Sequence, residues 1–134
     1  MKVGVTCAHE LWGLETFALV ERLGFDSLHC GEHLLSHRPV WDGITMTTAM
    51  ACATQRILVG PAALIAPLRH PFVLAKELAG ADRISGGRVV AALGVGGDNP
   101  RELAAAGVPG ERLGRRTDEV LQILRRSFSG ARFS

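Results

Sequence analysis

The chain has 134 residues, enough for one ordinary domain but short of the roughly 250 residues of a complete eight-stranded β/α barrel. Hydrophobic residues make up 47% and charged residues 21%, a composition typical of a globular protein that buries a core. The formal net charge of +2 is too small to indicate a nucleic acid or an anionic membrane as partner.

Short apolar runs alternate along the chain with longer amphipathic segments. The apolar runs predict strands at residues 2–6, 27–31, 57–65 and 88–95. The amphipathic segments predict helices at residues 14–23, 43–54, 71–84, 100–106 and 111–128. Strands that alternate with helices through short loops are typical of a parallel sheet with right-handed crossovers. Two architectures remain open from this pattern, a doubly wound open sheet or part of a (β/α)8 barrel.

Local signals mark the ends of several predicted helices. Gly24 is expected to end the first helix, and Asp42 to cap the second. Pro71 fits the first turn of the third helix, where its missing N–H costs nothing. Asn99 is expected to cap the fourth helix, with Glu102 completing a capping box by bonding back to the cap.

Cysteine usage and the N-terminus bear on the cellular compartment. The three cysteines are widely spaced, lack a CxxC pair and predict no disulfide framework. The N-terminus reaches His9 and Glu10 too early for the core of a signal peptide. No apolar run approaches the roughly 18 residues of a membrane span. We therefore expect a cytoplasmic protein.

Candidate chemistry gathers where the predicted strands end, because parallel β/α folds bind ligands at the carboxyl ends of their strands. The first strand ends near His9, and the second ends at Glu32 and His33. A carboxylate beside an imidazole can support proton transfer at such a rim. The alternative is a surface pair that only terminates the strand. Trp12 and Trp41 could cover a planar ligand, although packing is their commoner role.

Other readings of these residues are weaker. The turn at residues 94–97 resembles the start of a dinucleotide-binding loop, but Asn99 stands where that fingerprint needs glycine. A metal site could use the side chains of His29, Cys30, His33 and His37, but they lack a standard zinc spacing, and we predict no metal site.

Several segments, taken together, are similar to the luciferase-like flavin and deazaflavin oxidoreductases. They are residues 21–28, 31–33, 53–60, 69–77, 82–89 and 93–96. The series HP…AKE…DRISGGR, from His70 to Arg88, is the most specific of them. Ala63 departs from the larger aliphatic residue that is frequent in the family.

The resemblance implies an α/β fold, the N-terminal half of a (β/α)8 TIM barrel with about four parallel strands, each followed by a helix. Residues 1–134 would form this half barrel, truncated after the fourth β/α unit. It also implies an oxidoreductase that acts on a small-molecule substrate. The cofactor would be coenzyme F420 for hydride transfer, which we favour, or reduced FMN for monooxygenation.

The resemblance also assigns roles to residues at the rim. Glu32 and His33 are the implied catalytic residues, with His33 in proton transfer or in polarising the cofactor ring, and Glu32 orienting His33 or contacting the cofactor. A backbone bulge with a cis peptide is implied at Ala62–Ala63. The implied cofactor-binding positions are Ala62, Ala63, Gly94, Gly96 and Asn99.

The end of the chain falls where further strands and the family's phosphate-binding loops are expected. A half barrel would leave open sheet edges that favour pairing with another chain. We therefore expect a homo-oligomer or a complementing second half as partner. The alternative function is a non-catalytic half-barrel that dimerises or complements a missing C-terminal half.

Overall fold

The computed structural model describes residues 1–7 and 13–130. His9 and Trp12, both named above as candidates near the ligand, lie outside the described residues.

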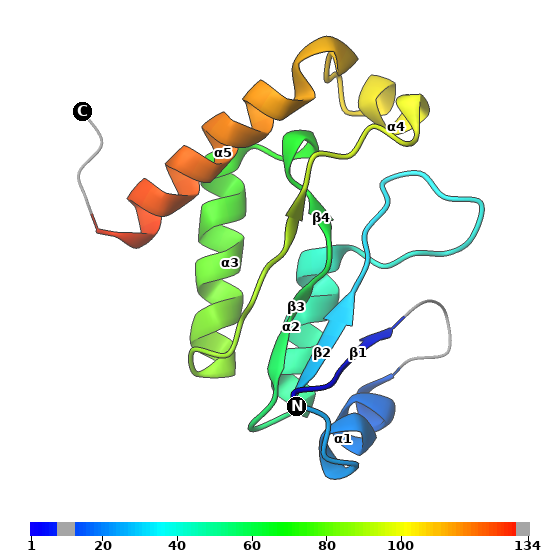
Figure 1. The fold of residues 1–134 in the computed structure, drawn as a ribbon, viewed down its shortest axis with the longest axis vertical. Helices are drawn as coiled ribbons and strands as arrows, with labels where there is room; N and C mark the ends of the chain where they lie inside the picture. The colour runs from blue at the N-terminus through cyan, green and yellow to red at the C-terminus, as the bar shows by residue number, and fades with distance from the viewer. Residues whose placement is uncertain (8–12, 131–134) are drawn as a thin grey trace.

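Parallel strands form the centre of the molecule (Figure 1). β1 (Gly4–Cys7), β2 (Ser27–Cys30) and β3 (Leu58–Pro61) pair in that order, and β4 (Leu64–Ile65) pairs with β5 (Leu93–Gly94). A parallel bridge between Val59 and Val89 and a 2.9 Å hydrogen bond from Ala92 N–H to Pro61 O join the two groups. The predicted parallel α/β arrangement is confirmed.

The predicted third strand is divided into β3 and β4. The division falls at the Ala62–Ala63 peptide bond, which is cis, as the family resemblance implied. The predicted fourth strand is regular only at β5, although its hydrogen bonds to the neighbouring strand begin at Arg88.

The helices follow the prediction closely. They are α1 (Leu14–Arg22), α2 (Gly43–Ala53), α3 (Pro71–Ser85), α4 (Pro100–Ala105) and α5 (Leu113–Phe128), with short 3₁₀ helices η1 (Ala66–Leu68) and η2 (Gly110–Arg112). Asp42 caps α2 by accepting the Thr45 N–H at 2.7 Å, as predicted. Gly86 ends α3 with a φ of 73°, a left-handed conformation that favours glycine. None of the helices in the described ranges is long and apolar enough to cross a membrane.

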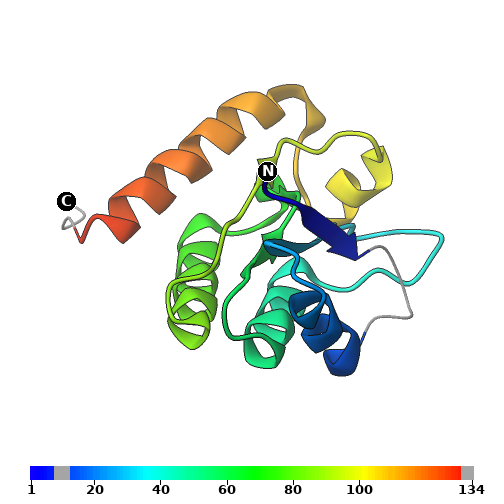
Figure 2. The ribbon, with the colours of Figure 1, turned by 60° about the horizontal axis from the view of Figure 1, so that its bottom comes forward.

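The helices α1, α2 and α3 cover one face of the strands (Figures 1 and 2). Val59 is fully buried on that face, within a cluster formed with α1 and α2. A second cluster joins β4 to α2, α3 and α5 and includes Leu64 and Leu74, both fully buried. Side chains alternate along a strand, so Leu58 and Val90 lie on the opposite face, where they remain 39% and 47% exposed. The core therefore lies on the helix side of the strands.

Glu21, near the end of α1, holds the turn that leads into β3. Its carboxylate accepts backbone N–H groups of Gln55, Arg56 and Ile57 at 2.6–3.1 Å. Burial alone would raise the pKa of Glu21, but these three N–H groups and the charge of Arg56 outweigh it and lower the pKa.

The lowered pKa predicts how Glu21 contributes to stability at different pH values. Its contribution should be full above the ordinary glutamate pKa of about 4.3 and be lost as the pH falls through the lowered folded-state value. We expect Glu21→Gln to lower the free energy of unfolding by about 1 kcal/mol at pH 7, allowing for solvent screening, and by less at pH 3. Urea unfolding at both pH values checks this, with the exposed Glu111→Gln as control. An equal cost at both pH values would contradict it.

Candidate functional site

Most of the residues predicted to form the site follow the carboxyl ends of β2, β3 and β5. Ala62 follows β3 and donates its N–H to Cys30 O, at the end of β2, at 2.6 Å. A side chain at Gly94 would lie 3.4 Å from the Ala63 Cβ atom, so these two positions are neighbours. Gly96 has a φ of 70°, and a Cβ atom there would lie 2.5 Å from Ile65. The cis peptide therefore lies beside Gly94, and the turn at Gly96 lies against Ile65.

Glu32 is buried just beyond the end of β2. Its carboxylate accepts the Ile65 N–H at 3.0 Å and the Gly43 N–H at 3.4 Å, and it pairs with the Arg69 guanidinium. These partners belong to β4, the start of α2 and the segment before α3. The carboxylate therefore ties together three elements of the rim, and it is not the group that contacts the His33 ring.

Arg69 carries the charge that balances Glu32. It also pairs with Asp42 and lies 3.5 Å from a Glu77 carboxylate oxygen. Burial alone would raise the pKa of Asp42, but the Thr45 N–H and Arg69 outweigh it and lower the pKa. Arg69 thus connects the helix cap of α2 with α3.

His33 finds its partner far along the chain. Its Nδ1 atom lies 3.2 Å from Oε1 of Glu102, in α4, and the same oxygen accepts the Leu35 N–H at 3.0 Å. The Glu102 side chain is 4% exposed, whereas the His33 side chain is 49% exposed. The predicted capping box is therefore wrong in its second half, because the Glu102 carboxylate turns to the loop after β2.

Asn99 has both polar groups of its side chain engaged. Its oxygen accepts the Arg101 N–H at 3.1 Å, which confirms the predicted helix cap. Its amide nitrogen donates to Leu35 O at 3.0 Å. A cofactor contact by Asn99 would therefore use its backbone or replace one of these bonds.

Two pockets open beside His33. One, of about 570 Å³, lies between the loop after β2 and the start of α4 and is lined by His33, Leu35, Ser36, His37, Asp98, Asn99 and Arg101. The other, of about 380 Å³, is lined by Glu32, His33, Leu34, Val40, Asp42, Leu68 and Arg69. His33 is the residue shared by both pockets. Ala62, Ala63, Gly94 and Gly96 line neither.

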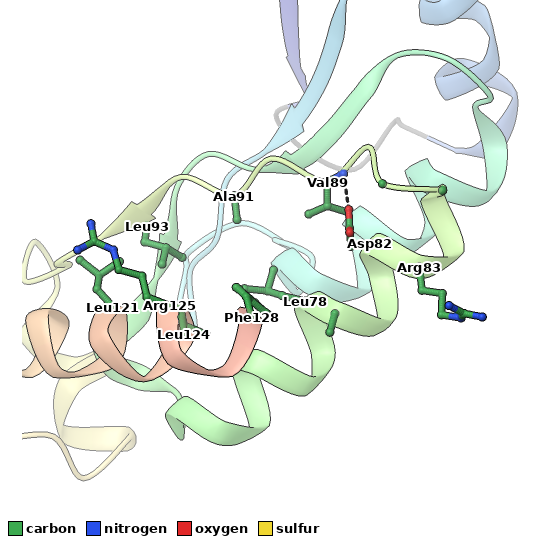
Figure 3. Close-up of a pocket in the computed structure, with 13 residues that line it drawn as sticks. Leu78, Asp82, Arg83, Val89, Ala91, Leu93, Leu121, Leu124, Arg125 and Phe128 are labelled. Atoms are coloured by element: carbon green, nitrogen blue, oxygen red, sulfur yellow. Dashed lines mark hydrogen bonds between the residues drawn. The ribbon is translucent and has the colours of Figure 1, made fainter. Parts of the chain in front are cut away.

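A larger groove, of about 870 Å³, lies elsewhere, between α3, the segment leading into β5, and α5 (Figure 3). Its walls are mainly apolar and include Leu78, Leu93 and Leu124. The Asp82 carboxylate at its side already accepts the Val89 N–H at 3.1 Å. The groove is on the helix side of the strands and contains none of the predicted site residues, so we place the candidate site at the rim.

The cysteines near the rim are poor nucleophiles. Burial raises the pKa of Cys7, and burial together with the neighbouring Cys7 raises that of Cys30 to about 12. At neutral pH both therefore remain thiols, whereas the thiolate is the reactive form.

Comparison with known proteins identifies related sequences and folds. The family model for luciferase-like monooxygenases matches residues 13–134. The chain is 32% identical over 126 residues to 4-hydroxyprotoasukamycin monooxygenase of Streptomyces nodosus subsp. asukaensis, covering 90% of this chain and 33% of that protein. It is also 32% identical over 124 residues to F420-dependent glucose-6-phosphate dehydrogenase of Beutenbergia cavernae, covering 85% of this chain and 36% of that protein.

A solved structure extends the comparison to the fold. The FMN complex of the oxygenating constituent of 3,6-diketocamphane monooxygenase from Pseudomonas putida matches with a TM-score of 0.83 at 22% identity. The match covers 94% of this chain and 39% of that one. The chain thus spans between a third and two fifths of the length of these relatives.

Proposed function

The chain belongs to the luciferase-like monooxygenase family, and from this membership we propose that its rim is the cofactor-facing part of an FMN- or F420-dependent oxidoreductase. The single observation that supports the proposal is that the end of β2, three residues before His33, is hydrogen-bonded through Cys30 O to the Ala62 N–H, and that Ala63 lies beside Gly94. Both cofactors occur among the relatives. The Beutenbergia dehydrogenase depends on F420, and the Pseudomonas structure contains FMN.

The residues of the rim fit a flat ring. Ala62, Ala63 and Gly94 carry no side chain larger than a methyl group, so a planar ligand can approach their backbone closely. When bound, the cofactor would supply the redox chemistry, as hydride transfer with F420 or as oxygen chemistry with reduced FMN. His33, half exposed beside both pockets, would hold or move a proton at its Nε2 atom.

The remaining predicted residues have supporting roles in this proposal. Glu32 and Arg69 would hold the loop after β2 against β4, and Asn99 would hold the same loop against α4. The glycine turn at Gly96 would keep side chains away from the ring. The substrate would be a small molecule that enters beside His33.

A titration of the full chain with F420 and with FMN, each oxidised and reduced, tests the proposal. We expect saturable binding of one cofactor class, and about tenfold weaker binding after His33→Ala, equivalent to about 1.4 kcal/mol. His70→Ala is the matched control, because His70 is an exposed histidine at the start of α3. Equal weakening by both variants would argue against a cofactor role for His33.

A second candidate function is a half-barrel that acts only with a partner. Its support is that the chain spans between a third and two fifths of its relatives, and that the strand face carrying Leu58 and Val90 is partly exposed. The partner would be a second copy or a polypeptide that supplies the rest of the barrel.

The same titration separates the two candidates. Binding by the chain alone supports the first, and binding only after co-expression with the remaining part of a relative's barrel supports the second. Sedimentation analysis would then distinguish self-association from complementation. Failure to bind under either condition would contradict the oxidoreductase function, and a chain that neither self-associates nor associates with the remaining part of a barrel would contradict the second function.

A further inference from the structure

The contact between Glu102 and His33 joins a buried carboxylate to a half-exposed imidazole. The two residues are 69 positions apart in the sequence and lie 3.2 Å apart at Oε1 and Nδ1. They come from different β/α units, the loop after β2 and the helix α4. A buried charged group is costly unless it has partners, so this carboxylate depends on the few contacts it makes.

The hydrogen-bond pattern defines which atom donates. Oε1 of Glu102 accepts the Leu35 N–H at 3.0 Å, which marks it as an acceptor. An ionised carboxylate has no proton to donate, so the His33 Nδ1 atom must carry the proton that lies between them. The other ring nitrogen, Nε2, is then left with its lone pair whenever the ring is neutral.

We propose that Glu102 is a positioning residue of the site, which holds neutral His33 in the tautomer that carries its proton on Nδ1 and leaves Nε2 as a proton acceptor beside the pockets. This inference rests on the proposed function only in the statement that Nε2 accepts a proton during the reaction. The tautomer itself is a property of the chain without cofactor.

The surroundings support a fixed geometry for this pair. Asn99 donates to Leu35 O at 3.0 Å, so the loop is held to the start of α4 from both the N–H and the carbonyl of Leu35. Within the described residues, no hydrogen bond is made at His33 Nε2, and the ring is 49% exposed. One side of the imidazole is thus anchored, and the other is open to a ligand.

Nitrogen NMR of the full chain, with ¹⁵N-labelled histidine and at a pH where the rings are neutral, measures the tautomer directly. The expected result is that Nδ1 of His33 behaves as the protonated ring nitrogen. Protonation on Nε2 in the unmodified chain would overturn the proposal, and this measurement requires no variant to fold.

Two substitutions then assign the effect to Glu102. Glu102→Met removes the acceptor at similar size and should lower the ratio of the Nδ1–H to the Nε2–H form about tenfold. Glu102→Gln keeps an acceptor oxygen and should retain the Nδ1–H form as the major one. The exposed Glu111→Met is the control and should leave the ratio unchanged. An unchanged ratio in a folded Glu102→Met chain would overturn the proposal.

Cofactor titration of the same samples keeps this inference separate from the proposed function. A protonated Nδ1 in a chain that binds neither F420 nor FMN would leave the role of Glu102 intact and contradict the oxidoreductase function. Binding of a cofactor by a chain whose His33 is protonated on Nε2 would support the oxidoreductase function and overturn the role of Glu102.

Discussion

Replacing Arg88 with alanine is expected to lower the free energy of unfolding of the chain by about 3–4 kcal/mol. The guanidinium donates to Thr54 Oγ1 and to four backbone carbonyls, at distances from 2.6 to 3.0 Å; these carbonyls belong to Ala51, Thr54, Ile57 and Ser85. Carbonyls at a helix end have no partner within the helix, and a cation there is also favoured by the helix dipole. Arg88 therefore completes the end of α2 and attaches it to the strand that follows α3.

Lysine is expected to recover only about 1 kcal/mol of this loss, because an ammonium group cannot form the planar fork that reaches several carbonyls at once. Urea unfolding followed by circular dichroism measures the change. Arg83→Ala, an exposed arginine in the last turn of α3, should change the unfolding free energy by less than about 0.5 kcal/mol. If Arg88→Lys lowered the unfolding free energy by as little as Arg83→Ala, a positive charge without the planar fork would be enough to stabilise the end of α2.

The order of strands and helices could be predicted because it depends on local signals. Apolar runs and helix caps act over a few residues, and Asp42, Gly86 and Asn99 perform the capping roles that their residue types indicate. The division of the third strand was different, because residues 57–65 read as one continuous apolar run. Periodicity does not reveal a cis bond, so the position of Ala62–Ala63 was expected only from the family resemblance.

The candidate site was predicted less well, because its contacts join distant segments. Sequence adjacency favours Glu32 as the partner of His33. Adjacent residues of extended backbone direct their side chains to opposite sides, which is a physical reason to doubt such a pair. The actual partner, Glu102, matched a complete local motif with Asn99, and nothing in that motif indicated a contact 69 residues away.

Replacing Glu32 with alanine is expected to lower the free energy of unfolding by about 3–5 kcal/mol. The substitution leaves the N–H groups of Gly43 and Ile65 without their acceptor and removes one carboxylate from Arg69. Glu32→Gln should cost less, about 2 kcal/mol, because one oxygen can still accept an N–H while the ion pair is lost. Urea unfolding of both variants gives these values.

His33→Ala provides the matched comparison, because it changes the neighbouring residue at the same rim. Its side chain is 49% exposed, so the expected cost in unfolding free energy is about 1 kcal/mol or less. The two substitutions should therefore have different main effects. Loss of the Glu32 carboxylate should mainly lower the unfolding free energy, and loss of the His33 ring should mainly weaken cofactor binding. A Glu32→Gln chain that kept its full unfolding free energy but no longer bound cofactor would mean that this carboxylate acts on the ligand. The contacts with Ile65, Gly43 and Arg69 would then contribute little to stability, because the substitution that breaks them would not have lowered the free energy of unfolding.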